Sequence, residues 1–180
     1  MSHAGYELNT FVKFHWIDSE NISKENVKEV FHGLHGIIVP GGFGNRGIEG
    51  MVLAAKYARE NRIPYFGICL GMQIAVIEFA RNVLGLSDAH SGEFDEQCIH
   101  KVIDFMPGQS DEIDKGGTLR LGSYPCSIKQ GTRMEKCYNA EIISERHRHR
   151  YEFNNDYREK LTEAGLVISG TSPDNRLVET

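Results

Sequence analysis

One short stretch, Gly67-Ile68-Cys69-Leu70-Gly71, follows an apolar run and leads directly into an apolar helical pattern. This order predicts a strand, a sharp turn and a helix, with Cys69 at the turn of a Gly-x-nucleophile-x-Gly elbow. Glycine has no Cβ atom, so the flanking glycines permit a tight bend. We interpret Cys69 as a nucleophile in a strained, exposed position; the alternative is a buried structural cysteine, a common environment for this residue type.

The start of a helix also favours cysteine chemistry. Unsatisfied backbone N–H groups and the positive end of the helix dipole favour a thiolate over a thiol. The N–H group of Leu70 is placed to stabilise an oxyanion when an acyl group is attacked. This position therefore predicts acyl transfer through Cys69.

The composition indicates one soluble globular domain of 180 residues, with a formal net charge of −5 and a pI near 5.9. The chain has no basic excess and no apolar run that could span a bilayer, so neither nucleic acid nor a membrane is an expected partner. It has no recognisable secretory leader, which predicts an intracellular, cytoplasmic protein. The four cysteines form no C-x-x-C pair or metal-ligand spacing, so no metal is expected, and Cys98, Cys126 and Cys137 are predicted to be packing residues.

Strand and helix patterns alternate along the first half of the chain. Strands are predicted at 10–17, 36–40 and 64–67, and helices at 23–31, at 48–61 and after Cys69. The uniform hydrophobicity of 36–40 predicts a strand buried on both faces. This order predicts an α/β fold with a doubly wound, mostly parallel sheet, helices on both faces, and a ligand site at the carboxyl ends of the strands.

A glycine-rich loop, Pro40-Gly41-Gly42-Phe43-Gly44-Asn45-Arg46-Gly47, joins a predicted strand to the helix at 48–61. Such a loop lets a ligand approach the backbone and directs N–H donors toward it. It matches neither a Walker loop nor the dinucleotide fingerprint. Since Gly42 and Cys69 both follow strands, we expect them to meet over one crevice; a merely flexible turn is the alternative.

The second half is less regular. Short strands are predicted at 101–105, 126–128 and 166–170, and a helix at 156–165. The acidic, glycine-rich stretch 107–117 is predicted to be mobile. The basic run 146–150 has no interleaved aromatic residue, which argues against nucleic-acid binding.

These segments resemble class I (triad-type) glutamine amidotransferases, and within them the glutaminase domains of CTP synthases. The likeness extends over nearly the whole chain and includes the loop, the elbow and three later segments: Gly92–Asp95, Lys115–Gly122 and Glu145–Glu152. The runs Gly-Phe-Gly-x-Arg-Gly and Glu-Arg-His-Arg-His-Arg-Tyr are distinctive of CTP synthases. The resemblance implies one flavodoxin-like amidotransferase domain over residues 1–180.

The resemblance also implies roles for individual residues. Cys69 would attack the side-chain amide of glutamine, release ammonia and form a glutamyl thioester, with the backbone of Gly42 and Leu70 as the oxyanion hole. Glu93 would pair with the α-ammonium group and Arg150 with the α-carboxylate, as the charges require. The implied glutamine-binding set is Gly42, Leu70, Gly71, Met72, Gln73, Glu93 and Arg150.

Further implications concern regulation and the rest of the enzyme. Arg46, Gly47 and Glu49 match a region linked to activation by GTP, and Arg120 falls in a segment expected to form a lid. This domain is expected to bind no cofactor. ATP, Mg²⁺ and UTP would bind an N-terminal amidoligase domain of the same enzyme, absent from these 180 residues, and the full-length enzyme would be a homo-oligomer, a tetramer.

The chain departs from the family pattern at the triad. The family carries its histidine and glutamate in a His-x-Glu segment shortly beyond the equivalent of residue 180, and no His-Pro-Glu occurs here. A cysteine nucleophile needs a base oriented by a third group, so two triad members are missing and the domain is expected to be truncated before that segment. A glutaminase subunit of another synthase, and a non-catalytic regulatory module, remain as alternatives.

Overall fold

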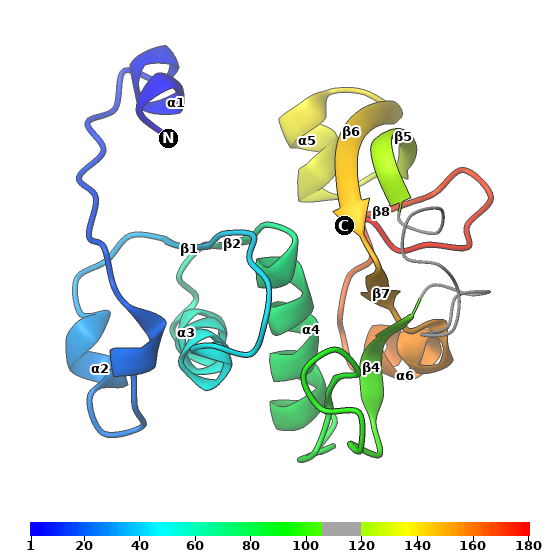
Figure 1. Cartoon of the computed structure of the whole chain (residues 1–180). Helices are drawn as coiled ribbons and strands as arrows, with labels where there is room; N and C mark the ends of the chain where they lie inside the picture. Colours follow the sequence, from blue (N-terminus) through cyan, green and yellow to red (C-terminus); the bar gives the residue numbers. More distant parts are fainter. Residues whose placement is uncertain (106–119) are drawn as a thin grey trace.

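A computed structural model describes residues 1–105 and 120–180 of the chain (Figure 1). The helices are α1 (Ser2–Glu7), α2 (Val27–Val30), α3 (Ile48–Asn61), α4 (Leu70–Asn82), α5 (Arg133–Tyr138) and α6 (Arg158–Glu163), with short 3-10 turns η1 (Ser19–Asn21) and η2 (Asn155–Tyr157). The strands are β1 (Ile37–Val39), β2 (Tyr65–Gly67), β3 (His90–Ser91), β4 (Lys101–Phe105), β5 (Arg120–Ile128), β6 (Ile142–His149), β7 (Tyr151–Phe153) and β8 (Gly170–Thr171).

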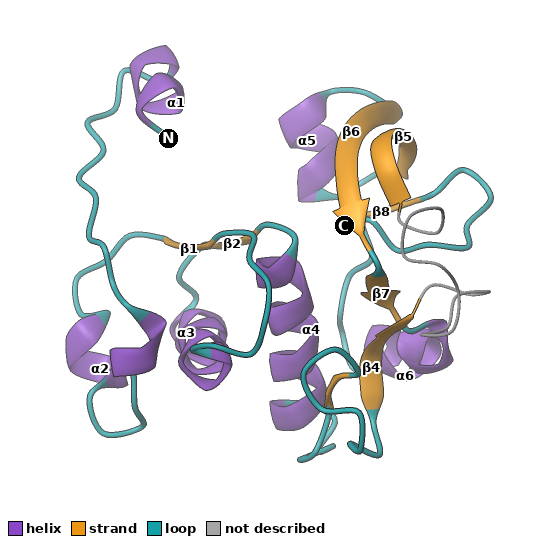
Figure 2. Ribbon diagram, in the orientation of Figure 1, coloured by secondary structure: helices purple, strands orange, loops and turns teal. Residues whose placement is uncertain are grey.

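The strands of the described residues pair in three small sheets, ordered β1-β2, β3-β4-β7 and β6-β5-β8 (Figure 2). The α/β class is confirmed, but parallel pairing is confined to β1–β2 and β3–β4, and the other pairs are antiparallel. The predicted continuous parallel sheet is therefore not seen in this part of the chain. The short connection through α5 returns β6 beside β5, as antiparallel neighbours allow.

Helix α4 lies at the centre of the larger hydrophobic core. Its Ile74 and Ile77 are fully buried and belong to one cluster with Val102 and Ile103 of β4 and Leu161 of α6. Helix α3 packs against α4, and on its other side a second cluster joins it to α2 and β1. The two helices thus support β1 and β2, whose carboxyl ends carry the glycine-rich loop and the elbow.

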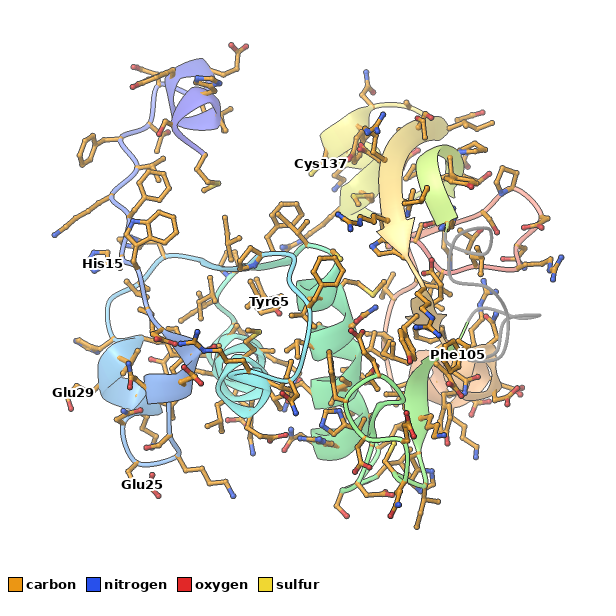
Figure 3. All side chains as sticks on the ribbon, in the orientation of Figure 1. His15, Glu25, Glu29, Tyr65, Phe105 and Cys137 are labelled. Atoms are coloured by element: carbon orange, nitrogen blue, oxygen red, sulfur yellow. The ribbon has the colours of Figure 1, made fainter. Side chains whose placement is uncertain are left out.

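Several predicted elements are confirmed. Helix α3 has the predicted bounds of 48–61, and β1, β2 and β4 lie where strands are predicted. The elbow helix begins directly after Cys69, as expected. Cys98 and Cys126 are buried, but Cys137 is exposed on α5, so its prediction as a packing residue is wrong (Figure 3).

Residues 10–17 do not form the predicted strand. The segment has β-forming residues but pairs with no strand in the described part of the chain, and Phe11 and Trp16 are 91% and 94% exposed. His15 is exposed on the same segment (Figure 3). A strand requires a partner ladder, so propensity alone is not sufficient here.

Three other boundaries and the burial of one strand differ from the predictions. The helix predicted at 23–31 shrinks to α2, because the Asn26 side chain accepts the N–H of Ser23 and donates to the Asn21 carbonyl, which competes with helix formation. Strand β1 is buried on one face only, since Ile38 is 39% exposed. Strand β5 begins at Arg120 rather than at 126, and the helix expected at 156–165 is split into η2 and α6.

Residues 166–169 are not a strand. The N–H groups of Ser169 and Gly170 donate to the Thr180 carbonyl, and only β8 joins the ladder of β5. The prediction for 107–117 lies outside the described residues.

Candidate active site

The turn at Cys69 has the geometry of a strained elbow. Cys69 has φ 56° and ψ −105°, a positive φ that non-glycine residues rarely adopt. A Cβ atom on Gly67 would lie 2.4 Å from the carbonyl carbon and oxygen of Gly71, and one on Gly71 would lie 2.1 Å from the Val39 oxygen. Both flanking glycines are therefore required by close backbone contacts, not by flexibility alone.

Contacts below the elbow fix its position. The Ile68 N–H donates to the Val39 carbonyl at 2.9 Å, and the Tyr65 hydroxyl donates to the Gly71 carbonyl at 2.8 Å. Tyr65 packs against both core clusters, in the space between α3 and α4 (Figure 3). The elbow thus rests on β1, β2 and the core.

The Cys69 thiol is half-buried and interacts with the backbone N–H groups of Leu70 and Gly42. Burial raises the pKa of this thiol, the two N–H groups lower it, and the charges of Glu152 and Glu93 raise it further. Burial outweighs the N–H groups, so the expected bias toward thiolate is not present in this structure. A base must therefore take the proton before Cys69 can attack.

The glycine-rich loop lies against the elbow, as predicted. A Cβ atom on Gly41 would be 3.3 Å from the Cys69 Cβ, and one on Gly42 would be 3.1 Å from Cδ2 of Leu70. Two backbone N–H groups from separate segments thus meet at one sulfur. This arrangement can stabilise an oxyanion that forms beside Cys69.

Glu93 lies in the loop after β3 and faces the same region. Its carboxylate accepts the backbone N–H of Gly44 and interacts with the charge of Arg150. Burial raises the pKa of this carboxyl, whereas the Gly44 N–H and Arg150 lower it. The two charged residues predicted to hold a free amino acid are therefore neighbours of each other, and Glu93 is also within electrostatic range of Cys69.

Arg150 occupies the bend between β6 and β7. Its guanidinium carbon lies 5.0 Å from the ring centroid of Phe105 and 5.8 Å from that of Tyr151, and Figure 3 shows Phe105 beside β7. Gln73 of α4 is 7% exposed and donates from Nε2 to the Tyr151 carbonyl at 3.0 Å. This amide therefore ties the elbow helix to the strand next to Arg150, whereas Met72 is only half-buried.

The three residues matched to GTP activation lie at the start of α3. Exposed Arg46 forms an ion pair with Glu20 at 2.5 Å, and Glu49 pairs with Arg81 at 2.9 Å. Gly47 has φ 68°, and a Cβ there would lie 2.1 Å from Oγ of Ser19. An open cavity of about 550 Å³ adjoins this corner; its lining includes Glu20, Asn45, Gly47, Glu49, His90 and Asp95.

The structure corrects the expectation for Arg120 and adds a residue. Arg120 is 6% exposed and ion-paired with Glu179, so it belongs to the interior rather than to a lid. Glu152, which sequence reasoning did not single out, is 5% exposed and acts on the Cys69 thiol. The sequence feature that could have identified Glu152 is its position at the end of the run 145–152, directly after Tyr151.

Two further observations apply to residues 1–105 and 120–180. No group of three or more His, Cys, Asp or Glu side chains in these ranges is arranged to hold a metal ion. No helix in the same ranges is both long and apolar enough to traverse a bilayer.

The elbow places this chain among α/β proteins that present a cysteine on a strand-to-helix turn beside two backbone N–H donors. A family profile described as "Glutamine amidotransferase class-I" matches residues 1–180, and the chain belongs to that family.

Within this family, the chain is similar to CTP synthases and to one solved glutaminase domain. The chain is 58% identical over 179 residues to a CTP synthase of Listeria innocua and 59% identical to one of Staphylococcus saprophyticus, covering 99% of this chain but 34% and 33% of those proteins. It thus spans about a third of the length of these relatives. The structure described as Trypanosoma brucei CTPS, glutaminase domain with bound acivicin, superposes with a TM-score of 0.89 at 41% identity, over 99% of this chain and 69% of that one.

Proposed function

We propose that this domain is the glutaminase part of a CTP synthase. It hydrolyses glutamine through a Cys69 thioester and supplies ammonia for the ATP-dependent amination of UTP to CTP. The observation that carries the proposal is the meeting of Cys69, two backbone N–H donors and an oppositely charged pair, Glu93 and Arg150. The similarity to CTP synthases over 99% of the chain supports it.

In the proposed reaction the Cys69 thiolate attacks the side-chain carbonyl carbon of glutamine. The N–H groups of Leu70 and Gly42 stabilise the resulting oxyanion. The C–N bond then breaks, the nitrogen gains a proton and leaves as ammonia, and a glutamyl thioester remains. Water hydrolyses the thioester, which releases glutamate and restores the thiol.

Recognition of the amino-acid end follows from charge. Glu93 pairs with the α-ammonium group and Arg150 with the α-carboxylate, so that glutamine is distinguished from a simple amide. In this proposal Gly71 and Met72 border the substrate at the start of α4. The bond from Gln73 to the Tyr151 carbonyl keeps the strand beside Arg150 close to the elbow.

The proton of Cys69 has to go to a base. His147 and His149 have pKa values lowered by burial and are neutral, but they belong to a buried charged cluster and match no triad motif. We assign the base to the family's His-x-Glu segment, which these 180 residues do not contain.

The rest of the reaction belongs to the whole enzyme. In the proposal, an N-terminal amidoligase domain of the same polypeptide binds ATP, Mg²⁺ and UTP and uses the ammonia, and the enzyme is a cytoplasmic homo-oligomer, a tetramer. Arg46, Gly47 and Glu49 are the proposed region for activation by GTP. Gly47 and Glu49 line an open cavity at the start of α3, which supports an effector role.

The test uses the full-length enzyme with Cys69→Ala. Glutamine-dependent CTP formation should fall by roughly 10³-fold or more, because the nucleophile is lost, whereas formation from added ammonia should persist. Cys137→Ala, an exposed cysteine on α5, is the matched control and should change neither activity. Unaltered glutamine-dependent activity in Cys69→Ala would refute the proposal.

One observation favours a second candidate, a non-catalytic regulatory module. Burial raises the pKa of Cys69, so the thiol stays protonated near neutral pH unless a base removes the proton. That candidate predicts glutamine binding without ammonia release in the full-length protein. A glutaminase subunit of a different synthase is disfavoured by the run 145–151.

A further inference from the structure

The described residues contain a buried charged cluster that the proposed reaction does not use. Its members come from β5, β6, β7 and the segment after β8, and their side chains are at most 19% exposed. They are Arg120, His147, His149, Glu152 and Glu179.

The cluster has more acidic groups than Arg120 can fully satisfy. Arg120 makes a two-point ion pair with Glu179, with Nη1 2.9 Å from Oε2. The same Nη1 lies 3.6 Å from Oε1 of Glu152, and Nδ1 of His149 lies 3.7 Å from that oxygen. Among residues 1–105 and 120–180, Oε1 of Glu152 is buried and has no hydrogen-bond partner, so Glu152 is the incompletely paired acid of the cluster.

The cluster also spans the place where the chain changes sheets. Strand β6 pairs with β5, whereas β7 pairs with β4 of a different sheet, and Arg150 is the residue between them (Figure 1). Arg120 lies directly opposite His149 in the β5–β6 ladder, and Glu152 lies two residues beyond Arg150 on β7. The residues before and after Arg150 are therefore held by the same buried charges.

We propose that Glu152 and Arg120 are positioning residues for Arg150: their interaction across the β6–β7 bend fixes Arg150 and thereby sets selectivity for the α-carboxylate of glutamine. This inference rests on the proposed function, because it takes Arg150 as the carboxylate-binding group. Neither Glu152 nor Arg120 needs to touch substrate. Gln73, bonded to the Tyr151 carbonyl, holds the same bend from the side of the elbow helix.

The selectivity for the α-carboxylate should also depend on pH. The pKa of Glu152 is raised to about 7, because burial and the charge of Glu179 raise it more than Arg120 lowers it. Within the described part of the chain, neutral His149 and the half-buried Cys69 thiol also lie near Glu152. Since ionised Glu152 attracts Arg120 more strongly, the selectivity should rise as pH passes upward through about 7.

The experiment measures alkylation of Cys69 in the full-length enzyme by two reagents. One is a chloroketone analogue of glutamine, and the other is the same chloroketone without its α-carboxylate. The ratio of their second-order rate constants reports carboxylate selectivity, and changes in thiol reactivity cancel in it. Glu152→Gln is compared with Glu78→Gln, which removes another buried, arginine-paired charge away from the bend.

The expected result is a roughly tenfold fall in this ratio for Glu152→Gln and no change for Glu78→Gln. A small displacement of Arg150 is sufficient to lower the rate with the carboxylate-bearing reagent by this factor. The rise of the ratio near pH 7 should disappear in Glu152→Gln and return in part in Glu152→Asp. Arg150→Ala separates the two proposals. If Arg150→Ala removes the preference for the reagent with the α-carboxylate but Glu152→Gln leaves that preference unchanged, the positioning role is wrong. If Arg150→Ala itself leaves the preference unchanged, the proposed carboxylate site is wrong.

Discussion

At the scale of single residues, the site depends on backbone contacts that allow no side chain. The positive φ of Cys69 brings its sulfur to the N–H groups of Leu70 and Gly42, and this requires Gly67 and Gly71 to lie against each other. Gly71 also approaches the Val39 carbonyl of β1. The elbow is therefore held by packing of α4 against two strands.

Gly71→Ala should disrupt this contact. Its Cβ would lie 2.1 Å from a backbone oxygen, so α4 must move away from β1, at a cost of about 3 kcal/mol or more in the free energy of unfolding. Chemical denaturation of both proteins measures the change. Gly36→Ala is the control, because its nearest contact would be an ordinary 3.6 Å; equal stabilities of the two variants would contradict the close packing of the elbow.

At the scale of elements, α3 and α4 are joined by a buried ion pair. Arg59 donates to Glu78 with a shortest distance of 2.8 Å, and the Glu78 side chain is 3% exposed. This pair fixes the two helices that carry the glycine-rich loop and the elbow.

Arg59→Ala should destabilise the protein by about 2 kcal/mol, because it leaves a buried carboxylate without its partner while Arg59 itself is partly exposed. Lys56→Ala on the same helix removes an exposed ion pair with Glu60 at 3.9 Å and an exposed hydrogen bond to Asn82 at 3.1 Å, and should cost less than about 1 kcal/mol. Thermal and denaturant unfolding measure both. A loss in Arg59→Ala no larger than in Lys56→Ala would show that the pair does not hold the helices.

The elements also show what sequence alone can specify. Local patterns predicted α3, β1, β2, β4 and the elbow helix, because each combines a clear periodicity with a turn signal. Residues 10–17 have strong β propensity but no ladder partner in the described chain, and a pattern cannot supply one. Likewise the bend at Arg150 depends on which sheet each neighbouring strand joins, which is a property of tertiary structure.

The sequence also does not reveal which distant charged residues lie together in the fold. The resemblance named Cys69, Glu93 and Arg150, and the structure brings these three together. The family resemblance did not indicate that Arg120 and Glu152, 32 positions apart in the numbering, share a buried cluster with Glu179. Burial of the thiol, which reverses the expected direction of its pKa, also arises only from packing.

At the scale of the whole molecule, buried Glu152 should make stability depend on pH. Its pKa is about 7 in the folded protein and near the ordinary 4.5 when unfolded, so the folded state holds the proton more tightly. The contribution to stability is complete below about pH 4.5 and is lost as pH rises through about 7, by up to about 3 kcal/mol. Denaturation from pH 5 to 8 should show this loss in the native protein and not in Glu152→Gln; parallel curves would contradict it.

The most direct test of the central claim, that Cys69 is a nucleophile in a glutamine pocket, is intact-mass analysis of the 180-residue chain after exposure to a chloroketone analogue of glutamine. One adduct should form at Cys69; free glutamine should prevent its formation, and Cys69→Ala should lack it. Formation should accelerate as pH rises, because burial keeps the thiol protonated at neutral pH. A folded chain that gains no adduct even at high pH, or gains it at exposed Cys137 instead, would show that Cys69 is not a nucleophile in a glutamine pocket.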